Sequence, residues 1–204
     1  MDLVTNTEST PPAAKPGGLR DQLLQTSREL LDEGGPAALS MREVARRAGC
    51  THQAPYHYFA NREAILAAVV AEGFRELADR LEAANDLVTT HDRRTVSEAS
   101  SNAYVGFAIM NPGVFQVMFR PDMINHAAYP EVVESGDRAR DALRRLVEIL
   151  YQDEASTELE IAMWANVHGL ASLLISGPLN YEIPTKEARL TYAEKVNKMY
   201  ADHF

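Results

Sequence analysis

The residues from 40 to 62 combine basic, hydrogen-bonding and small side chains at a spacing suited to contact with double-stranded DNA. Ser40 precedes Glu43 by three positions, which is the spacing of a capping box at the start of a helix. Gly49 follows where the end of that helix favours a left-handed residue, and Thr51 is placed to cap a second helix. Two short helices joined by a tight turn predict a helix-turn-helix, whose second helix lies in the major groove of DNA.

The second helix of this unit should carry side chains that meet DNA. Pro55 lies in or near its first turn, where a proline fixes φ and removes at most one marginal amide. Tyr58 and Phe59 are expected to anchor the helix on the core, and Asn61 to cap the helix that follows. Base edges and phosphates are contacted by small and hydrogen-bonding groups. Five exposed residues offer such groups: His52, Gln53, Ala54, Tyr56 and His57. The alternative is an ordinary helical hairpin within a bundle.

The net charge of −9 at pH 7 is unusual for a protein that binds DNA, but the charge is unevenly distributed. Between Pro36 and Arg62 the sequence holds four arginines and a single acid, Glu43, whereas most acids follow residue 62. Phosphate contact depends on local positive potential, and a remote acidic region is screened beyond a Debye length of about 8 Å. Arg62, in the first turn of the next helix, is placed for a phosphate. The pattern therefore predicts DNA binding that weakens strongly with salt.

Composition argues against several other classes of protein. The single cysteine, Cys50, rules out an intramolecular disulfide and fits a reducing cytosol. No apolar run reaches the length of a membrane span, so we expect a cytoplasmic protein with no membrane partner. The six histidines form no His-Glu-x-x-His or Cys/His cluster, which predicts no metal site. A phosphate-binding glycine loop, a nucleophile elbow and a dinucleotide fingerprint are also missing from the sequence, so we predict no catalytic residues and no cofactor.

The wider sequence shows no strand-type alternation, and glycines and prolines fall between helical segments, which predicts an all-α fold. Residues 1–18, rich in Thr, Pro, Ala and Gly, are expected to form a disordered arm. We assign a helix-turn-helix DNA-binding domain to 19–64 and a larger helical domain for ligand binding and dimerisation to 65–204. Outside the helix-turn-helix, helices are expected at about 19–33, 62–87, 94–110, 114–119, 129–152, 156–176 and 185–204. The helix from residue 62 would join the two domains and can transmit motion between them.

Methionines and aromatic residues gather in the expected C-terminal domain. Adaptable methionines and flat aromatic rings suit an irregular apolar cavity for a small molecule. The candidate ligand-binding residues are Tyr104, Phe107, Met110, Phe115, Met118, Phe119, Met123, Trp164 and His168. A dense hydrophobic core would show the same composition, and the sequence leaves both interpretations open.

The last two long helices carry more apolar surface than one chain readily buries. This surface predicts a homodimer, with the candidate interface residues Leu170, Leu173, Leu174, Tyr192, Val196, Met199 and Tyr200. A symmetric dimer would present two recognition helices about 34–36 Å apart, or a multiple of that distance, and so match a palindromic operator. The alternative is that these faces pack within one chain.

The N-terminal pattern resembles the DNA-binding domain of the TetR family of transcriptional regulators. In that family a first helix ends in glycine and is followed by "IAxxAGVS", "YxHF" and "SKExL". The corresponding segments here are Leu30–Gly35, Val44–Thr51, Tyr56–Phe59 and Asn61–Ile65. The resemblance implies that Tyr56 and Arg62 contact phosphates, while His52, Gln53 and Ala54 approach bases. The full set of candidate DNA-binding residues is Ser40, Arg42, Thr51, His52, Gln53, Ala54, Tyr56, His57 and Arg62.

The C-terminal half carries a second resemblance. Trp164, His168 and Gly169 are similar to the Trp-x-x-x-His-Gly signature of one TetR C-terminal subgroup, which implies a domain that binds a ligand and dimerises. Together the two resemblances imply a transcriptional regulator, specifically a repressor that a small-molecule effector releases from its operator. The alternative hypothesis is an all-α small-molecule-binding protein or enzyme in which the helix-turn-helix-like segment is purely structural. Specific binding to operator DNA would separate the two hypotheses.

Overall fold

The computed structural model describes residues 18–202, and every regular element within that range is helical. The α-helices are α1 (Leu19–Ala38), α2 (Met41–Arg47), α3 (Arg62–Asn85), α4 (Arg93–Met110), α5 (Pro112–Met118), α6 (Pro130–Tyr151), α7 (Thr157–Ile175), α8 (Leu179–Glu182) and α9 (Lys186–Ala201). Short 3-10 helices connect them: η1 (Ala54–His57), η2 (Asp86–Thr89), η3 (His126–Ala128) and η4 (Gln152–Glu154). The prediction of an all-α fold is confirmed. The predicted arm, apart from Gly18, lies outside the described residues.

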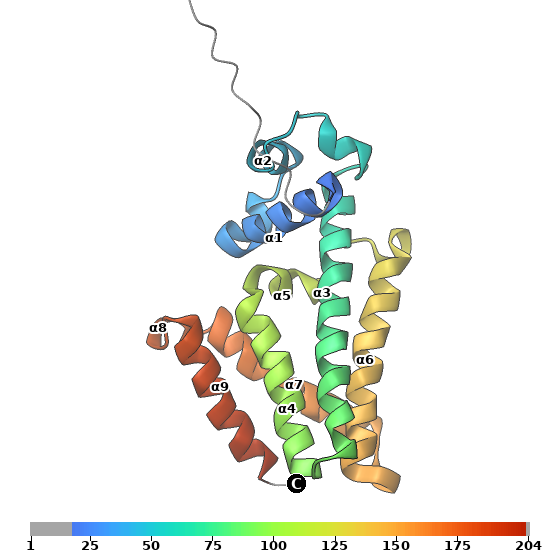
Figure 1. Ribbon diagram of the computed structural model, residues 1–204, viewed down its shortest axis with the longest axis vertical. Helices are drawn as coiled ribbons and strands as arrows, with labels where there is room; N and C mark the ends of the chain where they lie inside the picture. Colours follow the sequence, from blue (N-terminus) through green and yellow to red (C-terminus); the bar gives the residue numbers. More distant parts are fainter. Residues whose placement is uncertain (1–17, 203–204) are drawn as a thin grey trace, which may run out of the picture.

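The helices form a small group at one end of the molecule and a larger body. Figure 1 shows α1 and α2 at that end, with α3 running from them along the length of the body. α6 packs alongside α3, and α4 packs against α3, α7 and α9. The helix predicted from residue 62 is therefore continuous, and it crosses the position at which we divided the chain into two domains.

Side-chain caps fix where most of these helices begin. A side-chain oxygen at the N-cap accepts a hydrogen bond from the main-chain amide three residues later, which satisfies one of the free amides of the first turn. The predicted caps at Ser40 and Asn61 are confirmed, with distances of 3.2 Å and 2.8 Å to the amides of Glu43 and Ala64. The same arrangement begins α4, α7 and α9, at Asp92, Ser156 and Thr185.

The α-helices α1 and α8 differ from the sequence-based expectation. α1 continues beyond Glu33 to Ala38, although Gly35 has a φ of 63° and breaks the helical geometry just before Pro36. Glycine reaches this left-handed region without steric cost, and proline suits the first turn of the helical segment that follows. The short helix α8, Leu179–Glu182, was not expected, because Gly177 and Pro178 are typical of the end of helical structure.

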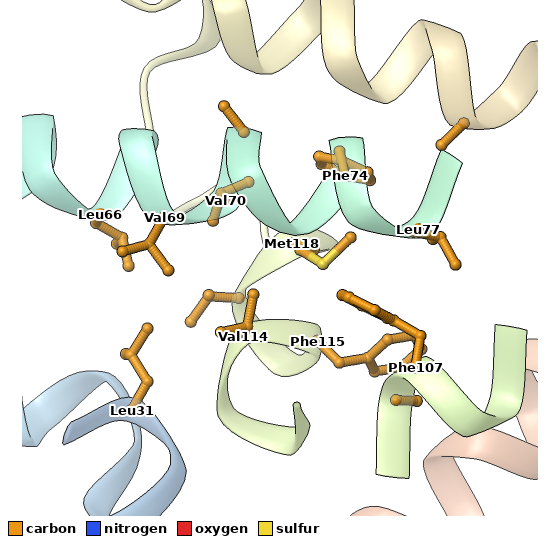
Figure 2. Packing of buried hydrophobic residues seen from close by; sticks show 14 of the residues in the cluster. Leu31, Leu66, Val69, Val70, Phe74, Leu77, Phe107, Val114, Phe115 and Met118 are labelled. Atoms are coloured by element: carbon orange, nitrogen blue, oxygen red, sulfur yellow. The ribbon is translucent and has the colours of Figure 1, made fainter. Parts of the chain in front are cut away.

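One main hydrophobic core extends through both parts of the molecule. It includes buried leucines of α1, the inner face of α3, and residues of α4, α5, α6 and α7. Figure 2 shows Leu31 of α1 facing Val114 of α5 and Val69 of α3, while Met118 of α5 lies against Phe74. A separate, smaller core at the far end of the body contains Val96, Leu146, Val147, Leu150 and Met163. The helix-turn-helix is thus fixed to the body by shared packing as well as by α3.

Across residues 18–202, none of the helices combines the length and the apolar character that a membrane crossing requires.

Candidate functional site

The turn between the two helices of the helix-turn-helix has the predicted geometry. Gly49 has a φ of 66°, in the left-handed region that glycine favours. The main-chain amide of Cys50 donates to the carbonyl of Ala45 at 3.1 Å, which closes the end of α2. The Glu43 carboxylate accepts hydrogen bonds from the guanidinium groups of Arg46 and Arg47 on the same helix. The hydrogen bond from Arg46 is the main reason that the pKa of Glu43 falls to about 2.

The second helix is shorter and tighter than predicted. It is the single 3-10 turn Ala54–His57, and its N-cap is Gln53 rather than Thr51, with no side-chain cap. The amides of Tyr56 and Tyr58 donate to the carbonyls three residues earlier, at 3.1 Å and 3.0 Å. Pro55 accounts for this difference, because it lacks an amide hydrogen and its ring would clash with the carbonyl of the fourth residue before it in an α-helix.

This turn projects a set of side chains into solvent. We name residues Thr51–Tyr58 the reading turn. Its exposed side chains are Thr51, His52, Gln53, Tyr56, His57 and Tyr58. Ala54 is half-buried and Pro55 is buried. Phe59, which is 4% exposed, anchors the turn on the core as predicted, but Tyr58 is 47% exposed and does not. Most of the residues that the sequence assigned to DNA contact therefore share one exposed surface.

Arg62 is placed differently from the prediction. Its Nε donates to the carbonyl of Leu39 at 2.7 Å, and its Nη2 donates to the carbonyl of Pro36. These carbonyls lie at the end of α1, where the main chain lacks helical partners and a cation is favourable. The half-buried guanidinium is thus engaged inside the protein instead of lying free for a phosphate. No local pattern in the sequence indicates this, because 23 and 26 positions separate the partners.

The other arginines of the region divide into paired and exposed side chains. Arg47 forms an ion pair with Glu33 of α1 at 2.6 Å and with Glu43, and Arg46 pairs with Glu43 at 2.7 Å. Arg42, one of the predicted DNA-binding residues, is exposed in the first turn of α2. Of the two predicted arginine contacts, Arg42 therefore remains the better placed for phosphate.

α1 and α5 meet at a close main-chain contact. The amide of Gly113 donates to the Asp32 carboxylate at 2.7 Å. A Cβ atom at Gly113 would overlap the main-chain carbonyl group of Leu31, so a residue other than glycine cannot occupy this position without a shift of α1. Arg28 of α1 also donates to Glu76 of α3 at 2.7 Å and to Asn111, just before α5, at 3.1 Å.

The predicted ligand-binding residues include a chain of three hydrogen-bonded rings. Trp164 Nε1 donates to Tyr104 Oη at 2.9 Å, and Tyr104 Oη lies 2.9 Å from His168 Nδ1. Burial lowers the pKa of His168, which favours a neutral ring. An indole nitrogen can only donate, so the Tyr104 hydroxyl is free to direct its own proton to His168. The rings of Phe115 and Phe119 lie against His168, with centroids 5.2 Å and 4.8 Å away.

These residues divide into a buried set and a half-buried set. Tyr104, Phe107, Phe115 and Met118 are buried in the main core, whereas Phe119, Met123, Trp164 and His168 are half-buried. Met110 is 44% exposed at the end of α4 and does not belong to this packing, which corrects its assignment. Two surface depressions, one beside α6 around Val133 and Asp137 and one beside α9 around Tyr192, are not lined by these residues. The cluster is thus part of the core with one partly accessible side.

The predicted dimer-interface residues differ in their exposure to solvent. Leu170 and Leu174 are buried in the chain's own core, because α7 packs against α4 along that side, so they cannot face a partner. Val196 and Tyr200 are half-buried. Leu173, Tyr192 and Met199 are 43%, 40% and 70% exposed, and Ile161 of α7, which the sequence analysis did not select, is 45% exposed. Ile161 lies twelve positions before Leu173, which places the two side chains about 120° apart around α7, so helical periodicity does not link them.

Within the described residues, no group of three or more His, Cys, Asp or Glu side chains is arranged to hold a metal ion.

Comparison with known proteins identifies both halves of the chain. The family model described as bacterial regulatory proteins, tetR family, matches residues 23–69. The model described as tetracyclin repressor-like, C-terminal domain, matches residues 98–193. The HTH-type transcriptional regulator Rv1816 from Mycobacterium tuberculosis is 29% identical over 104 residues, which cover 51% of this chain and 44% of that protein. The match thus spans less than half the length of this relative, and the relatives found are regulators rather than enzymes.

Solved structures share the whole fold. A protein of unknown function from Rhodococcus sp. RHA1 is 29% identical, with a TM-score of 0.71 over 90% of this chain and 95% of that one. The TetR family transcriptional regulator PfmR from Thermus thermophilus has a TM-score of 0.67 at 20% identity, over 90% and 93% of the two chains. At that identity the second comparison supports the fold alone.

Proposed function

The chain belongs to the TetR family of bacterial transcriptional regulators, and we propose that it binds a palindromic operator as a homodimer and represses transcription until a small molecule releases it. The observation that carries the proposal is the exposed reading turn, held in place by the Phe59 anchor and the Asn61 cap. An exposed turn of hydrogen-bonding and aromatic side chains on a rigid base suits the major groove. Such a regulator would work in the cytoplasm, where bacterial DNA lies.

DNA contact would be divided between two kinds of side chain. Residues at the start of the reading turn, Thr51, His52 and Gln53, would approach base edges, and Tyr56 with His57 would contact the sugar-phosphate backbone. Arg42 and the hydroxyl of Ser40, both exposed at the start of α2, would add phosphate contacts. In this proposal Arg62 acts indirectly, because it fixes the end of α1 and the start of α3 relative to the turn.

The exposed apolar side chains of α7 and α9 support the homodimer. Ile161, Leu173, Tyr192 and Met199 lie on the two helices that the sequence analysis selected for self-association. Exposure of several large apolar side chains to water is energetically unfavourable. Association of two chains about a two-fold axis would bury the same surface on each of them. The four helices brought together would form an interface of the bundle type.

The aromatic cluster, which consists of Tyr104, Phe115, Phe119, Trp164 and His168, would provide the effector site. α5 would connect this site to the DNA-binding end. A ligand that enters beside Phe119 and His168 must displace rings that belong to α5 or pack on it. α5 contacts α1 through the Gly113 and Asp32 hydrogen bond, so a displaced α5 would move α1 and the reading turn with it. The ligand can shift this equilibrium only by its difference in affinity for the two arrangements.

Fluorescence anisotropy with the duplex upstream of the protein's own coding region tests the proposal. We expect specific binding that survives a random-sequence competitor and weakens at least about tenfold between about 50 and 200 mM salt. Tyr56→Ala should abolish this binding while circular dichroism shows an intact fold. Tyr181→Ala, a change at an 86% exposed tyrosine of α8, is the matched control and should bind normally. Specific binding unaffected by Tyr56→Ala, or no specific binding at all, contradicts the proposal.

A further inference from the structure

The reading turn contains neither lysine nor arginine. Between Ala48 and Asn61 the sequence has neither lysine nor arginine. The nearest arginines on either side are engaged, since Arg46 and Arg47 pair with Glu43 and Arg62 donates to main-chain carbonyls. Arginine and lysine are the usual readers of guanine, through its O6 and N7 atoms. The reading turn therefore lacks the two side chains that most often select guanine.

One exposed side chain of the turn matches a different base. The amide of Gln53 carries a donor and an acceptor on one planar group. That pair is complementary to N7 and the N6 amino group of adenine in the major groove. A neutral imidazole also has a donor and an acceptor, but its two nitrogens point in different directions, so His52 and His57 cannot form this paired contact with one base. The ring of His52 is also partly engaged, because it lies against the ring of Tyr56 with centroids 6.0 Å apart.

The main chain holds Gln53 in a defined position. It is the N-cap of η1, with helical φ and ψ of −83° and −22°, and its carbonyl accepts the amide of Tyr56 at 3.1 Å. Residues at the N-terminal end of a recognition element are the ones that reach base edges. The main chain is fixed while the side chain is exposed, so pairing with a base has to order the side chain alone.

We infer that Gln53 is a specificity-determining residue that reads one adenine in each half of the operator. This inference rests on the proposed DNA-binding function and names the base that the reading turn recognises. The Gln53 amide donates to adenine N7 and accepts from the N6 amino group. The small methyl groups of Thr51 and Ala54, on either side in the sequence, suit contact with thymine methyls of adjacent pairs.

The test begins with duplexes selected from a random library by the purified full-length chain. At the proposed adenine of one half-site, 7-deazaadenine keeps base pairing but removes the N7 acceptor. We expect this change to weaken wild-type binding at least about fivefold, the lower end for one bidentate contact. Gln53→Ala removes the contact from both half-sites, so it should bind the natural duplex with a larger loss and show no further loss with 7-deazaadenine. His57→Ala, at an exposed neighbour, is the control and should keep the full sensitivity to 7-deazaadenine.

A second variant makes the test independent of any effect on folding. Gln53→Glu keeps an acceptor and loses the donor, so a second selection should move the preferred base at this position from adenine to cytosine, whose N4 amino group a carboxylate accepts. Selection of the same base by wild type and Gln53→Glu would overturn the inference. It would also be overturned if Gln53→Ala lost the same affinity on duplexes with and without the proposed adenine. Either result leaves the proposed DNA binding standing, whereas a wild-type chain that enriches no sequence overturns both.

Discussion

The main-chain amide of Gly113, at the start of α5, donates a 2.7 Å hydrogen bond to the carboxylate of Asp32 near the end of α1. The two residues are 81 positions apart in the sequence. They join α1, at the DNA-binding end, to α5, which carries Phe115 and Met118, two of the candidate ligand-binding residues. The contact leaves no space for a side chain at position 113. Arg28 of α1 also donates a hydrogen bond to Asn111, just before α5.

Gly113→Ala should destabilise the protein, because the added methyl group would overlap the main chain of Leu31. Overpacking against an immobile backbone typically costs about 1–3 kcal/mol in the free energy of unfolding, measured by urea denaturation. Gly106→Ala is the matched control in α4, where the nearest atom to the new methyl group is Leu190 Cδ2 at 3.8 Å. It should leave stability unchanged or raise it by up to about 1 kcal/mol. Equal stabilities for the two variants would contradict the close contact.

Arg62→Ala should reduce stability as well as DNA affinity. A hydrogen bond from a charged donor stabilises a folded protein by about 1.5–3 kcal/mol. This variant removes two such hydrogen bonds, to the main-chain carbonyls of Pro36 and Leu39. Arg42→Ala should change the free energy of unfolding by less than about 0.5 kcal/mol. It should reduce the slope of log affinity against log salt by about one phosphate contact for each subunit of the proposed dimer. If Arg62→Ala lowers DNA affinity at unchanged stability, its guanidinium binds phosphate and the structural role is wrong.

Acidification should destabilise the protein through His168. Burial lowers the pKa of this ring in the folded state, so its contribution to stability is complete above the ordinary histidine pKa of about 6.5 and is lost as pH falls through the lowered value. Protonation also removes the acceptor for the Tyr104 hydroxyl. The melting temperature of wild type should therefore fall more between about pH 7.5 and 5 than that of His168→Gln. His57→Gln, at an exposed histidine, should follow wild type; equal falls for all three proteins would exclude this role.

Leu173→Glu should convert the proposed homodimer to a monomer while the fold is retained. The side chain is 43% exposed in the single chain, so a carboxylate there is tolerated by the monomer but not in an apolar interface. Light scattering should give a mass near 22.6 kDa for the variant and twice that for wild type. Val133→Glu alters an equally exposed residue of α6 and should remain dimeric. A dimeric Leu173→Glu protein would move the interface elsewhere.

Local signals explain why so much of the fold was predictable. The caps at Ser40 and Asn61 and the left-handed Gly49 depend on neighbours within a few residues, and all three are present as expected. The 3-10 geometry of η1 was also encoded locally, in Pro55, but its effect was underestimated.

Contacts between distant segments explain what could not be predicted. Arg62 is engaged by carbonyls more than twenty residues away, and nothing near it in the sequence identifies them. On α7, Leu173 and Leu174 are adjacent and chemically identical, yet one is exposed and the other is fully buried. Only the position of α4 determines which of the two faces inward.

The core that runs unbroken from Leu31 to Phe74 has a consequence for how such proteins diversify. We expect that the N-terminal helices cannot be exchanged alone between relatives without loss of stability, because buried leucines of α1 belong to the main core. A chimera with a foreign α1 would need a matching α5, including glycine at position 113, before it could fold. We therefore expect substitutions on the exposed surface of the reading turn to alter operator preference more readily than an exchange of α1.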